Sequence, residues 1–455
     1  MIKEKIYELK KWKRVVHTTW NPNGPGVIRI HMVPPKFSWF KNNPAIALLN
    51  GQDIVPLNTS WAVLLTEFID AVNEFGPNEM SDEELKNIID KAFQGVKAVY
   101  PSVSEEVLEE DLNIIVDTFE DIARGRTPKQ EIGILSIGEY APNMTAPHRM
   151  DLMISAMTKE DKWNCNQKCV HCYAAGQKHS QVNELSTDEW KKIIAACEKA
   201  KIPQLTFTGG EPTMRKDLVE LVKEARWFVT RLNTNGVLLT KQLCKELKEA
   251  ELDSIQVTFY SKDANIHNTL VGAANYEKTL SGIKNALEEG INLSTNTPLC
   301  SLNKDYVETL KFLHDLGVRY VTCSGLIITG NATKEASVGT QLSSDEIYEI
   351  VKEATQFCYE NGMEISFTSP GWIEADKLSE LNLTIPSCGA CLSNMAITPD
   401  GKVIPCQSWL SWETLGDMRT DSFKKIWNSK QCKKNREFSA KMEQVCPLRG
   451  KAGNE

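Results

Sequence analysis

The chain has 455 residues, of which 41% are hydrophobic and 25% are charged, the balance of a folded protein rather than of a disordered or collagen-like one. The net charge of −8 and the absence of a Lys/Arg-rich block argue against a nucleic-acid partner. No stretch approaches the roughly 18 apolar residues of a membrane span, and the first residues contain no apolar signal segment. A cytoplasmic protein without a membrane partner is therefore expected, and its length suggests about three domains.

Residues 1–145 contain no cysteine and predict a small α+β domain. Short strands are expected at 27–33 and 45–49, and Pro56-Leu57-Asn58-Thr59-Ser60 is expected to open a helix. Capping boxes are predicted at Ser81-Asp82-Glu83-Glu84 and at Ser102-Val103-Ser104-Glu105. The helix after the second box has an expected stop at Gly125 and one apolar stripe, made of Leu108, Leu112, Ile115, Phe119 and Ile122.

Residues 146–335 alternate short apolar runs with amphipathic stretches. The runs predict strands at 152–156, 204–208, 228–233, 254–259, 291–296 and 319–323. Helices are predicted at 216–225, 241–250, 276–289 and 306–316. Strands that alternate with helices in this way favour a parallel βα architecture, open or barrel-like, with ligand chemistry at the carboxyl ends of the strands. Residues 336–385 are interpreted as a helical linker, and residues 386–455 as a compact cysteine-rich domain.

The 13 cysteines, in a chain without an export signal, predict metal ligands or free thiols rather than disulfides. Cys165, Cys169 and Cys172 follow the first strand of the βα series at C-x3-C-x2-C spacing. Three thiolates on one short loop can hold three corners of a cubane iron–sulfur cluster and leave the fourth iron open for an exchangeable ligand. A closed zinc site, with His171 as its fourth ligand, is the alternative.

A glycine pair ends the second strand of the series, in Thr208-Gly209-Gly210-Glu211-Pro212. Adjacent glycines allow a backbone to approach a ligand closely, and Glu211 adds an acceptor for an ammonium group. This turn alone is a weak signal, but it follows the cysteine motif by one strand. Together the two motifs resemble the radical S-adenosylmethionine (radical SAM) superfamily over roughly residues 150–335.

The resemblance implies an α/β fold, a partial (β/α)6 barrel, and a role for each matching residue. Cys165, Cys169 and Cys172 would hold a [4Fe-4S] cluster, and Gly209, Gly210, Glu211 and Pro212 would hold the methionine part of S-adenosylmethionine. Three later strand ends match positions close to the nucleotide, namely Asn235, Thr258 and Asn296. His171 departs from the aromatic residue common before the third cysteine. Asp263 and His267 are interpreted as solvated surface residues.

The last cysteines resemble SPASM and twitch domains, which carry auxiliary iron–sulfur clusters. Gly401 precedes Cys406 by four intervening residues, after Cys388 and Cys391, as in those domains. The resemblance implies one auxiliary cluster, with ligands Cys388, Cys391, Cys406 and Cys446, and zinc remains the alternative. Cys432 is expected to be packed inside a helix. Five isolated cysteines are interpreted as core thiols: Cys197, Cys244, Cys300, Cys323 and Cys358.

The N-terminal region resembles the winged-helix-like RiPP recognition element, mainly through the Leu57-Asn58-x-x-Trp61-Ala62 start of its helix and its final helix. In that family a leader peptide adds as a strand to a sheet edge. An accessory fold without a peptide is the alternative.

These resemblances imply a radical SAM maturase of a ribosomal precursor peptide, with a flavodoxin or ferredoxin as electron donor. Reductive cleavage of S-adenosylmethionine would give a 5′-deoxyadenosyl radical, which takes a hydrogen atom from the peptide so that a thioether or other crosslink forms. The auxiliary cluster would accept an electron. The alternatives are a maturase of a folded protein or small metabolite, and a zinc-stabilised binding protein without redox chemistry.

Overall fold

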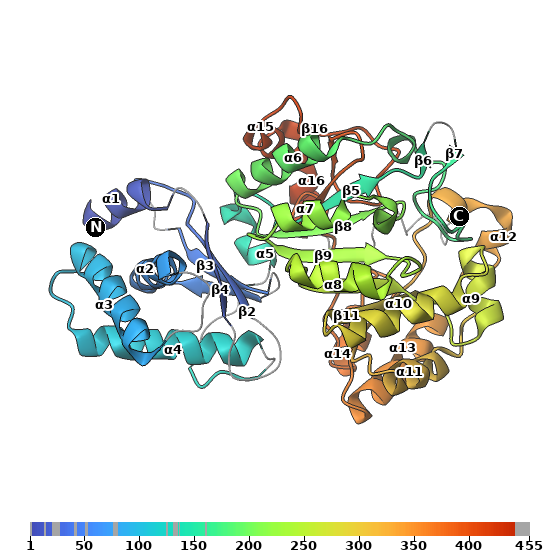
Figure 1. Ribbon diagram of the computed structural model, residues 1–455, viewed down its shortest axis with the longest axis horizontal. Coiled ribbons are helices and arrows are strands. Elements are labelled where there is room, and N and C mark those ends of the chain that lie inside the picture. The colour runs from blue at the N-terminus through green and yellow to red at the C-terminus, as the bar shows by residue number, and fades with distance from the viewer. Residues whose placement is uncertain are drawn as a thin grey trace. The chain divides into compact units, whose positions relative to one another are not determined.

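The computed structural model describes residues 2–12, 15–20, 28–40, 43–50, 53–75, 81–123, 126–130, 135, 137–159 and 162–441. The chain forms two compact units, one of Met1–His148 with Glu198–Pro203 and one of Arg149–Cys197 with Gln204–Glu455 (Figure 1). Among the described residues, no helix is both long enough and apolar enough to cross a membrane.

The first unit is an antiparallel sheet covered by helices. The four strands lie in chain order: β1 (Val16–Trp20), β2 (Ile28–Val33), β3 (Ala45–Leu49) and β4 (Asp53–Leu57). The helices are α1 (Ile2–Lys10), α2 (Thr59–Phe75), α3 (Asp82–Val99), α4 (Glu105–Ala123) and the short α5 (Ile137–Tyr140). Every residue of β2 and β3 is buried, and α2 contacts all four strands. Two central strands buried in this way form the core of a separate domain.

Two of these strands were not predicted. Pro56 and Leu57 end strand β4, and they do not begin the helix as expected. The helix starts at Thr59, where the Asn58 side chain accepts a hydrogen bond of 2.8 Å from the backbone N–H of Trp61. A proline is tolerated in β4 because this strand lies at a sheet edge, where one side of the backbone needs no ladder partner.

The predicted helix starts agree in part with the structure. Ser81 and Glu84 form the reciprocal capping box of α3. The second box is wrong: Ser104, rather than Ser102, precedes α4, and its hydroxyl accepts a hydrogen bond of 3.4 Å from the N–H of Val107. All five residues of the predicted stripe on α4 are buried. The expected stop at Gly125 lies outside the described residues.

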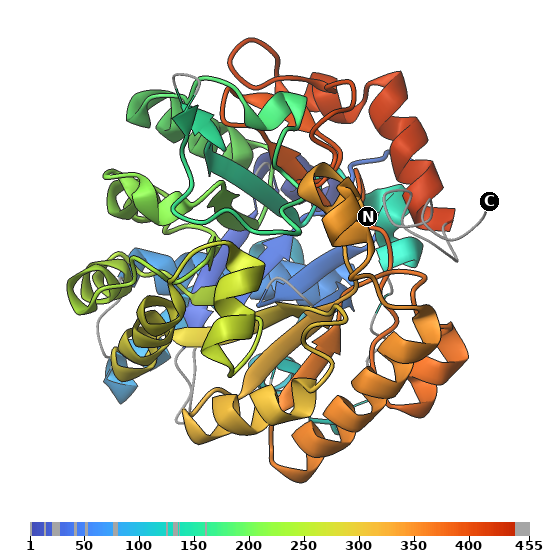
Figure 2. The ribbon, with the colours of Figure 1, turned by 90° about the vertical axis from the view of Figure 1, so that its right-hand side faces the viewer.

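The second unit contains the predicted parallel strands. The six strands lie side by side in chain order: β5 (Arg149–Ser155), β8 (Gln204–Gly209), β9 (Val229–Thr234), β10 (Ser254–Thr258), β11 (Asn292–Pro298) and β12 (Tyr320–Ser324). The helices between them are α6 (Thr187–Lys199), α7 (Leu218–Glu224), α8 (Lys241–Glu249), α9 (Ala264–Val271), α10 (Tyr276–Glu288) and α11 (Tyr306–Asp315). These helices lie around the outer side of the curved sheet (Figure 2). The α/β architecture expected from the sequence is confirmed.

The sheet continues beyond these six strands on both sides. Strand β13 (Glu364–Phe367) pairs in parallel with β12, inside the region interpreted as a helical linker. That region also contains α12 (Glu335–Val338), α13 (Ser344–Glu360) and α14 (Ala375–Glu380). At the other side, β14 (Asn394–Ile397) pairs in parallel with β5, followed by β15 (Lys402–Ile404) and β16 (Gly416–Asp417). Helices α15 (Phe423–Trp427) and α16 (Lys430–Lys441) complete the unit, together with a hairpin of β6 (Thr158–Lys159) and β7 (Lys162–Trp163).

Candidate functional site

A cavity of about 620 Å³ lies at the inner side of the parallel sheet. Its lining brings together residues predicted from separate motifs: Cys165, Cys169, Cys172, Gly209, Gly210, Glu211, Asn235, Thr258, Asn296, Cys388 and Cys406. Pro212 is buried at the start of a 3-10 turn, Pro212–Met214, and Cys391 is fully buried; neither lines the cavity. Cys446 lies outside the described residues. Motifs that are more than 200 positions apart thus face one space, because parallel strands present their carboxyl ends at one edge.

The loop that carries the first three cysteines is held by backbone hydrogen bonds. The N–H groups of Lys168 and Val170 donate to the carbonyls at the end of α9, at 2.9 Å each. Asn331 holds the other side: its backbone N–H donates to the carbonyl of Cys172 at 2.9 Å, and its side chain donates to that of Cys169 at 3.0 Å. The cysteine loop is therefore fixed by two segments that follow it in the chain by about 100 and 160 residues.

Two glycines allow those segments to approach, and neither was identified from the sequence. Gly272 ends α9 with a φ of +63°, and a Cβ atom there would lie 2.3 Å from the carbonyl oxygen of Lys168. Gly330 has a φ of +60°, and its Cβ would lie 2.5 Å from the carbonyl oxygen of Cys172. The Val271-Gly272 pair had the pattern of a helix C-cap. The contact of Gly272 with the cysteine loop depends on tertiary structure, so the neighbouring residues could not predict it.

The three thiols are close enough to affect one another electrostatically. Burial raises the pKa of Cys165 to about 12, and the charges of Glu211 and Cys172 add to this shift. Burial and then the neighbouring Cys172 and Cys165 raise the pKa of Cys169 well above its usual range. The thiol of Cys165 lies 3.8 Å from the carbonyl oxygen of Gly210. Three thiolates at these positions are unfavourable unless a cationic centre is bound between them.

The glycine pair lies directly against the end of β5. Gly209 has a φ of +135°, and a Cβ atom there would lie 2.3 Å from the carbonyl oxygen of Ser155. The N–H of Gly210 donates to this same carbonyl at 2.7 Å. A side chain at either position would displace the neighbouring strand, so glycine is required here by both space and backbone conformation.

Glu211 is fully buried, and its carboxylate accepts four hydrogen bonds from the protein. One oxygen accepts from the N–H and hydroxyl of Thr213 and from the hydroxyl of Thr234, at 3.0, 2.5 and 2.6 Å. The other accepts from the N–H of Asn235 at 2.8 Å. Burial raises its pKa, although these bonds oppose the shift. In the structure Glu211 therefore joins two strand ends. One of its oxygens has three donors and the other has one, so the second oxygen and the backbone carbonyls of Gly209 and Gly210 are candidate acceptors for an ammonium group.

Asn235 connects this turn to the cysteine loop. Its side-chain amide donates to the side-chain oxygen of Asn166 at 2.6 Å, and its own oxygen accepts from the N–H of Val237 at 3.1 Å. The turn after the third strand is thus hydrogen-bonded to Asn166, the residue that follows Cys165.

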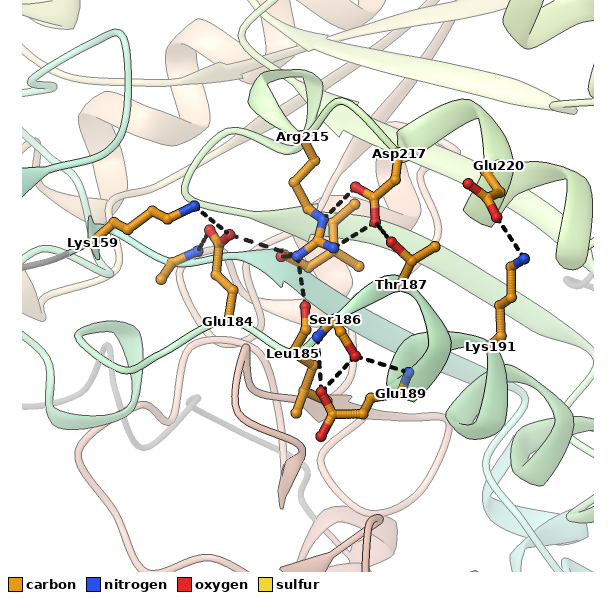
Figure 3. Close-up of polar contacts among 12 residues, drawn as sticks. Lys159, Glu184, Leu185, Ser186, Thr187, Glu189, Lys191, Arg215, Asp217 and Glu220 are labelled. Atoms are coloured by element: carbon orange, nitrogen blue, oxygen red, sulfur yellow. Dashed lines mark hydrogen bonds and ion pairs between the residues drawn. The ribbon is translucent and has the colours of Figure 1, made fainter.

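A second network lies behind the cysteine loop (Figure 3). The guanidinium of Arg215 donates to both carboxylate oxygens of Asp217, at 2.9 and 2.6 Å, and to the carbonyls of Ile154 and Leu185, at 3.0 and 3.1 Å. It also forms an ion pair of 3.6 Å with Glu184.

Glu184 carries this network to the cysteine loop. It accepts from the N–H of Ala156 at 2.9 Å and from the side chain of Asn164 at 3.1 Å, one residue before Cys165. Arg215 and Glu184 therefore tie the end of β5 to the start of the cysteine loop.

The remaining predicted residues have different surroundings. Thr258 and Asn296 line the cavity, and the Asn296 side chain accepts from the hydroxyl of Thr322 at 2.9 Å. The Nε2 atom of His171 lies 2.7 Å from the hydroxyl of Thr340, and burial lowers the pKa of the ring to about 4.

The surface interpretation of His267 is wrong. This side chain is completely buried in α9, between the rings of Phe259, Tyr260 and Tyr276. Asp263 is exposed and caps α9 by accepting from the N–H groups of Asn265 and Ile266. Nothing in the residues around His267 indicated whether its side chain would be buried or exposed.

The later cysteines divide into two pairs. Cys388 and Cys406 pack in one cluster with Trp409, and both line the cavity. Cys391 and Cys432 are both fully buried, and their thiols form a hydrogen bond. That bond and burial raise the pKa of Cys391, whereas the same bond and the Arg436 guanidinium lower the pKa of Cys432. Cys432 is inside helix α16 and packed, as expected, but it is also the thiol partner of Cys391. The five isolated cysteines are all buried in the core.

Helix α16 places one stripe of side chains over the Cys388–Cys391 loop. Arg436 donates to the sulfur of Cys432 at 3.7 Å and Asn435 to that of Cys391 at 3.9 Å. Ser439 lies 3.6 Å from the sulfur of Cys388. Because positions 432, 435, 436 and 439 share one helix face, the helix presents a thiol and three donors to the same loop.

Donor chemistry decides whether these residues fit iron–sulfur clusters. Three thiols face one cavity beside the end of β8, and two more thiols face the same cavity from the segments before β14 and after β15. Thiolate ligation by several cysteines is the chemistry of an iron–sulfur centre, and metal binding deprotonates thiols whose pKa is raised. The described residues contain no three His, Cys, Asp or Glu side chains gathered closely enough around one point to hold a single ion. The donor set fits a [4Fe-4S] cluster with S-adenosylmethionine and one auxiliary cluster.

Comparison with protein families agrees with this geometry. Residues 164–313 match the radical SAM superfamily, and residues 388–448 match SPASM, an iron–sulfur cluster-binding domain. Among curated relatives, the Fe-coproporphyrin III synthase of Methanosarcina barkeri is 32% identical over 44% of this chain and 52% of its own. The PqqA peptide cyclase of Bradyrhizobium diazoefficiens is 29% identical over 56% of this chain and 66% of its own. The matches thus span about half to two thirds of these relatives.

Among solved structures, SuiB of Streptococcus suis bound to its precursor peptide SuiA superposes with a TM-score of 0.57. The match covers 87% of both chains at 14% identity, so it shows a common fold. The expected fold is confirmed. The chain contains a region of the radical SAM superfamily at residues 164–313, and an SPASM domain follows it at residues 388–448.

Proposed function

We propose that this protein is a radical SAM maturase that forms a crosslink, such as a thioether, in a ribosomal precursor peptide. The observation that carries this proposal is the shared cavity: the three cysteines of the first motif and two cysteines of the SPASM domain line one space. A substrate held there has a radical-forming site and an electron-accepting site within reach.

Cys165, Cys169 and Cys172 would hold the [4Fe-4S] cluster, and the carbonyls of Gly209 and Gly210 would accept hydrogen bonds from the amine of S-adenosylmethionine. The bound pair supplies one-electron cleavage of the sulfonium bond to methionine and a 5′-deoxyadenosyl radical. Asn235, Thr258 and Asn296 line the path that the nucleotide would take across the strand ends. The enclosing sheet limits access of water to the site.

The later cysteines would serve the second half of the reaction. Closing a bond between a carbon radical and a thiol releases one electron and one proton, so the site needs an acceptor. Cys388 and Cys406 face the cavity, and we assign them to an auxiliary cluster together with Cys391 and either Cys432 or Cys446. Burial and hydrogen bonds to sulfur set the potential of such clusters, and Ser439, Asn435 and Arg436 supply donors of this kind.

The first unit would bind the leader of the precursor. Its sheet has two edge strands, β1 and β4. The carbonyl of Ile54 in β4 already accepts from the N–H of Leu135 at 3.0 Å. Strand β1 pairs only with β2 among the described residues, so β1 is the edge at which we place an added peptide strand.

Anaerobic turnover tests the proposal. Purified protein with reduced flavodoxin or ferredoxin and S-adenosylmethionine should yield 5′-deoxyadenosine, and the precursor encoded beside its gene should lose two hydrogens in mass spectrometry. A leader peptide without the core should compete with the precursor. If 5′-deoxyadenosine forms but the peptide mass stays constant while an added porphyrin or other metabolite is consumed, the protein acts on a metabolite and the peptide assignment is wrong.

A further inference from the structure

The inner face of the parallel sheet carries polar side chains where most barrels pack aliphatic ones. Alternate residues of neighbouring strands face the cavity. Six of them are polar: Thr206, Arg231, Asn233, Gln256, Asn296 and Thr322. A barrel interior that only stabilises the fold is filled with branched aliphatic residues. This interior is therefore built to receive a polar ligand.

The two sides of this interior differ in how their polar atoms are satisfied. On one side, Gln256 donates to Thr322 at 3.2 Å, and Thr322 donates to Asn296 at 2.9 Å. On the other side, the Oγ1 of Thr206, the Nε of Arg231 and the Oδ1 of Asn233 have no hydrogen-bond partner within the described parts of the chain. Thr206 is only 1% exposed. Buried polar atoms without partners cost free energy, so this side is arranged for a ligand that supplies them.

The same side carries excess positive charge. Arg149 pairs with Asp151, with 2.9 Å between its Nε and a carboxylate oxygen. Arg231 lies near both charges but forms no hydrogen bond or ion pair with the residues that the structure describes. Burial and the charge of Arg149 lower its pKa to about 10, so the guanidinium stays protonated at neutral pH. Asp151 and the Cys406 thiol both offset the charge of Arg149, so the charge of Arg231 is the one that lacks a hydrogen-bonded counter-ion within the described residues.

The position of Arg231 separates it from the methionine site. Arg231 precedes Thr234, which contacts Glu211, by three residues, so its backbone lies roughly 10 Å deeper along the strand. The register places Arg231 beside Thr206, and Thr206 beside Asp151, so the guanidinium is held at the level of Asp151. The carboxylate and amine of S-adenosylmethionine are on the same carbon atom and would both lie near Gly209 and Gly210. A different anion is needed at Arg231.

We propose that Arg231, with Thr206, binds a carboxylate of the substrate, the side chain of an Asp or Glu close to the modified residue of the peptide. The Oδ1 of Asn233 is an acceptor and would take a donor beside that carboxylate, such as a peptide N–H. The guanidinium and the Thr206 hydroxyl donate to the carboxylate oxygens, and Arg149 adds charge from the side. This specificity site rests on the proposed peptide maturation. It defines the substrate class as a peptide whose core carries an acidic residue.

The experiment combines an enzyme variant with peptide variants. Arg231→Gln is compared with Arg226→Gln, an exposed arginine of the same unit that pairs with Glu251 at 3.4 Å. Each Asp and Glu of the precursor core is replaced by its amide in turn. We expect Arg231→Gln to raise KM for the precursor on the order of 30-fold, because a charge-assisted hydrogen bond is lost, whereas the surface variant stays within about twofold.

A double-mutant cycle identifies the partner. One Asp→Asn or Glu→Gln peptide should show the same rise in KM with the unchanged enzyme and no further rise with Arg231→Gln. Arg231→Lys, which keeps the charge, should recover part of the affinity. Independent, additive effects of the two changes would overturn the proposal, and so would a larger rise in KM for S-adenosylmethionine than for the peptide. If the unchanged enzyme forms no peptide product at all, the proposed function fails instead.

Discussion

The two cysteine regions of the second unit are built differently around the same cavity. The loop of Cys165, Cys169 and Cys172 is irregular chain, held through its backbone by α9, by Asn331 and by glycines that approach within contact distance. The loop from Cys388 to Cys391 is also held through its backbone, but a helix face in addition donates hydrogen bonds to its sulfur atoms. In the first region the three thiols face the cavity; in the second, two thiols face it and two are buried behind.

This difference suits the two regions to different tasks: binding an exchangeable cofactor in the first, and holding an electron in the second. In the first loop the thiols of Cys165 and Cys169 contact oxygen acceptors rather than donors, and all three thiols face the cavity, where an exchangeable ligand can reach them. A site whose sulfur atoms receive donors and a guanidinium stabilises negative charge and keeps water away. The first region is therefore suited to binding and cleaving a cofactor, and the second to holding an electron.

The largest effect should come from removing one thiol of the first loop. Cys169→Ala should lower 5′-deoxyadenosine formation more than about 1,000-fold, because all three thiolates act as one unit. Iron analysis should show a loss of about four iron atoms per chain while the auxiliary iron remains. Cys244→Ala, at an isolated core thiol, is the matched control and should keep both. Cleavage retained in the Cys169 variant would remove the assignment of this loop.

Removing a thiol of the SPASM domain should stop product formation without stopping cleavage of S-adenosylmethionine. Cys406→Ala should still form 5′-deoxyadenosine at a rate within about threefold of the unchanged enzyme but give less than about a tenth of the peptide product, because the electron released on bond formation has no acceptor. Product mass and 5′-deoxyadenosine are measured in the same reaction. Full product from this variant would contradict the electron-accepting role.

The buried thiols Cys391 and Cys432 allow the fourth ligand of the auxiliary cluster to be identified. Cys432→Ser and Cys446→Ser should differ in iron content, because only one of these thiols completes the auxiliary ligand set. The contact between Cys432 and Cys391 predicts that Cys432→Ser lowers auxiliary iron by more than about half, whereas Cys446→Ser keeps it. Mössbauer spectra of both variants supply the measurement, and the opposite pattern would assign Cys446.

The backbone support of the first loop can be tested without touching a thiol. Gly272→Ala and Gly290→Ala both place a side chain at positive φ, +63° and +66°, but only the first meets a neighbouring backbone atom within 4 Å. Gly290→Ala should lose about 1 kcal/mol of unfolding free energy, and Gly272→Ala should lose more, because its Cβ atom would also lie 2.3 Å from the carbonyl oxygen of Lys168. Only Gly272→Ala should also reduce cluster retention and cofactor cleavage, by about tenfold. Equal activities would show that the loop does not depend on α9.

The smallest effects concern the network behind the loop. Arg215→Ala removes a guanidinium whose side chain is only 9% exposed and which donates four hydrogen bonds, and it should cost about 3 kcal/mol of unfolding free energy and a few-fold in activity. Lys191→Ala removes an ion pair with Glu220 at the surface of the same region and should change stability by less than about 0.5 kcal/mol (Figure 3). Thermal unfolding of both variants tests the difference.

Local sequence determined the strands and the chemistry of this protein. The six apolar runs of the second unit became six parallel strands within a few residues of their predicted ends, because short runs of apolar and β-branched residues between amphipathic helices are a local signal of strands. The spacing of Cys165, Cys169 and Cys172 and the Gly209-Gly210 pair likewise carried their meaning in a few adjacent residues. Strands β1, β4 and β13 were not predicted, because short or edge strands carry no strong periodicity.

Tertiary structure alone decided which residues meet. The sequence assigned Glu211 to an ammonium group, and only the fold shows that its carboxylate also joins the turn at Thr213 to the end of β9 at Thr234 and Asn235. It interpreted His267 as a surface residue, and the fold buries it among three aromatic rings. The contact of Cys391 with Cys432 depends on helix placement, and the position of Arg231 near the charges on β5 depends on strand order. The spacing of residues within a motif reflects local geometry. Contacts between distant segments form only when the strands assemble into the sheet and create its inner face.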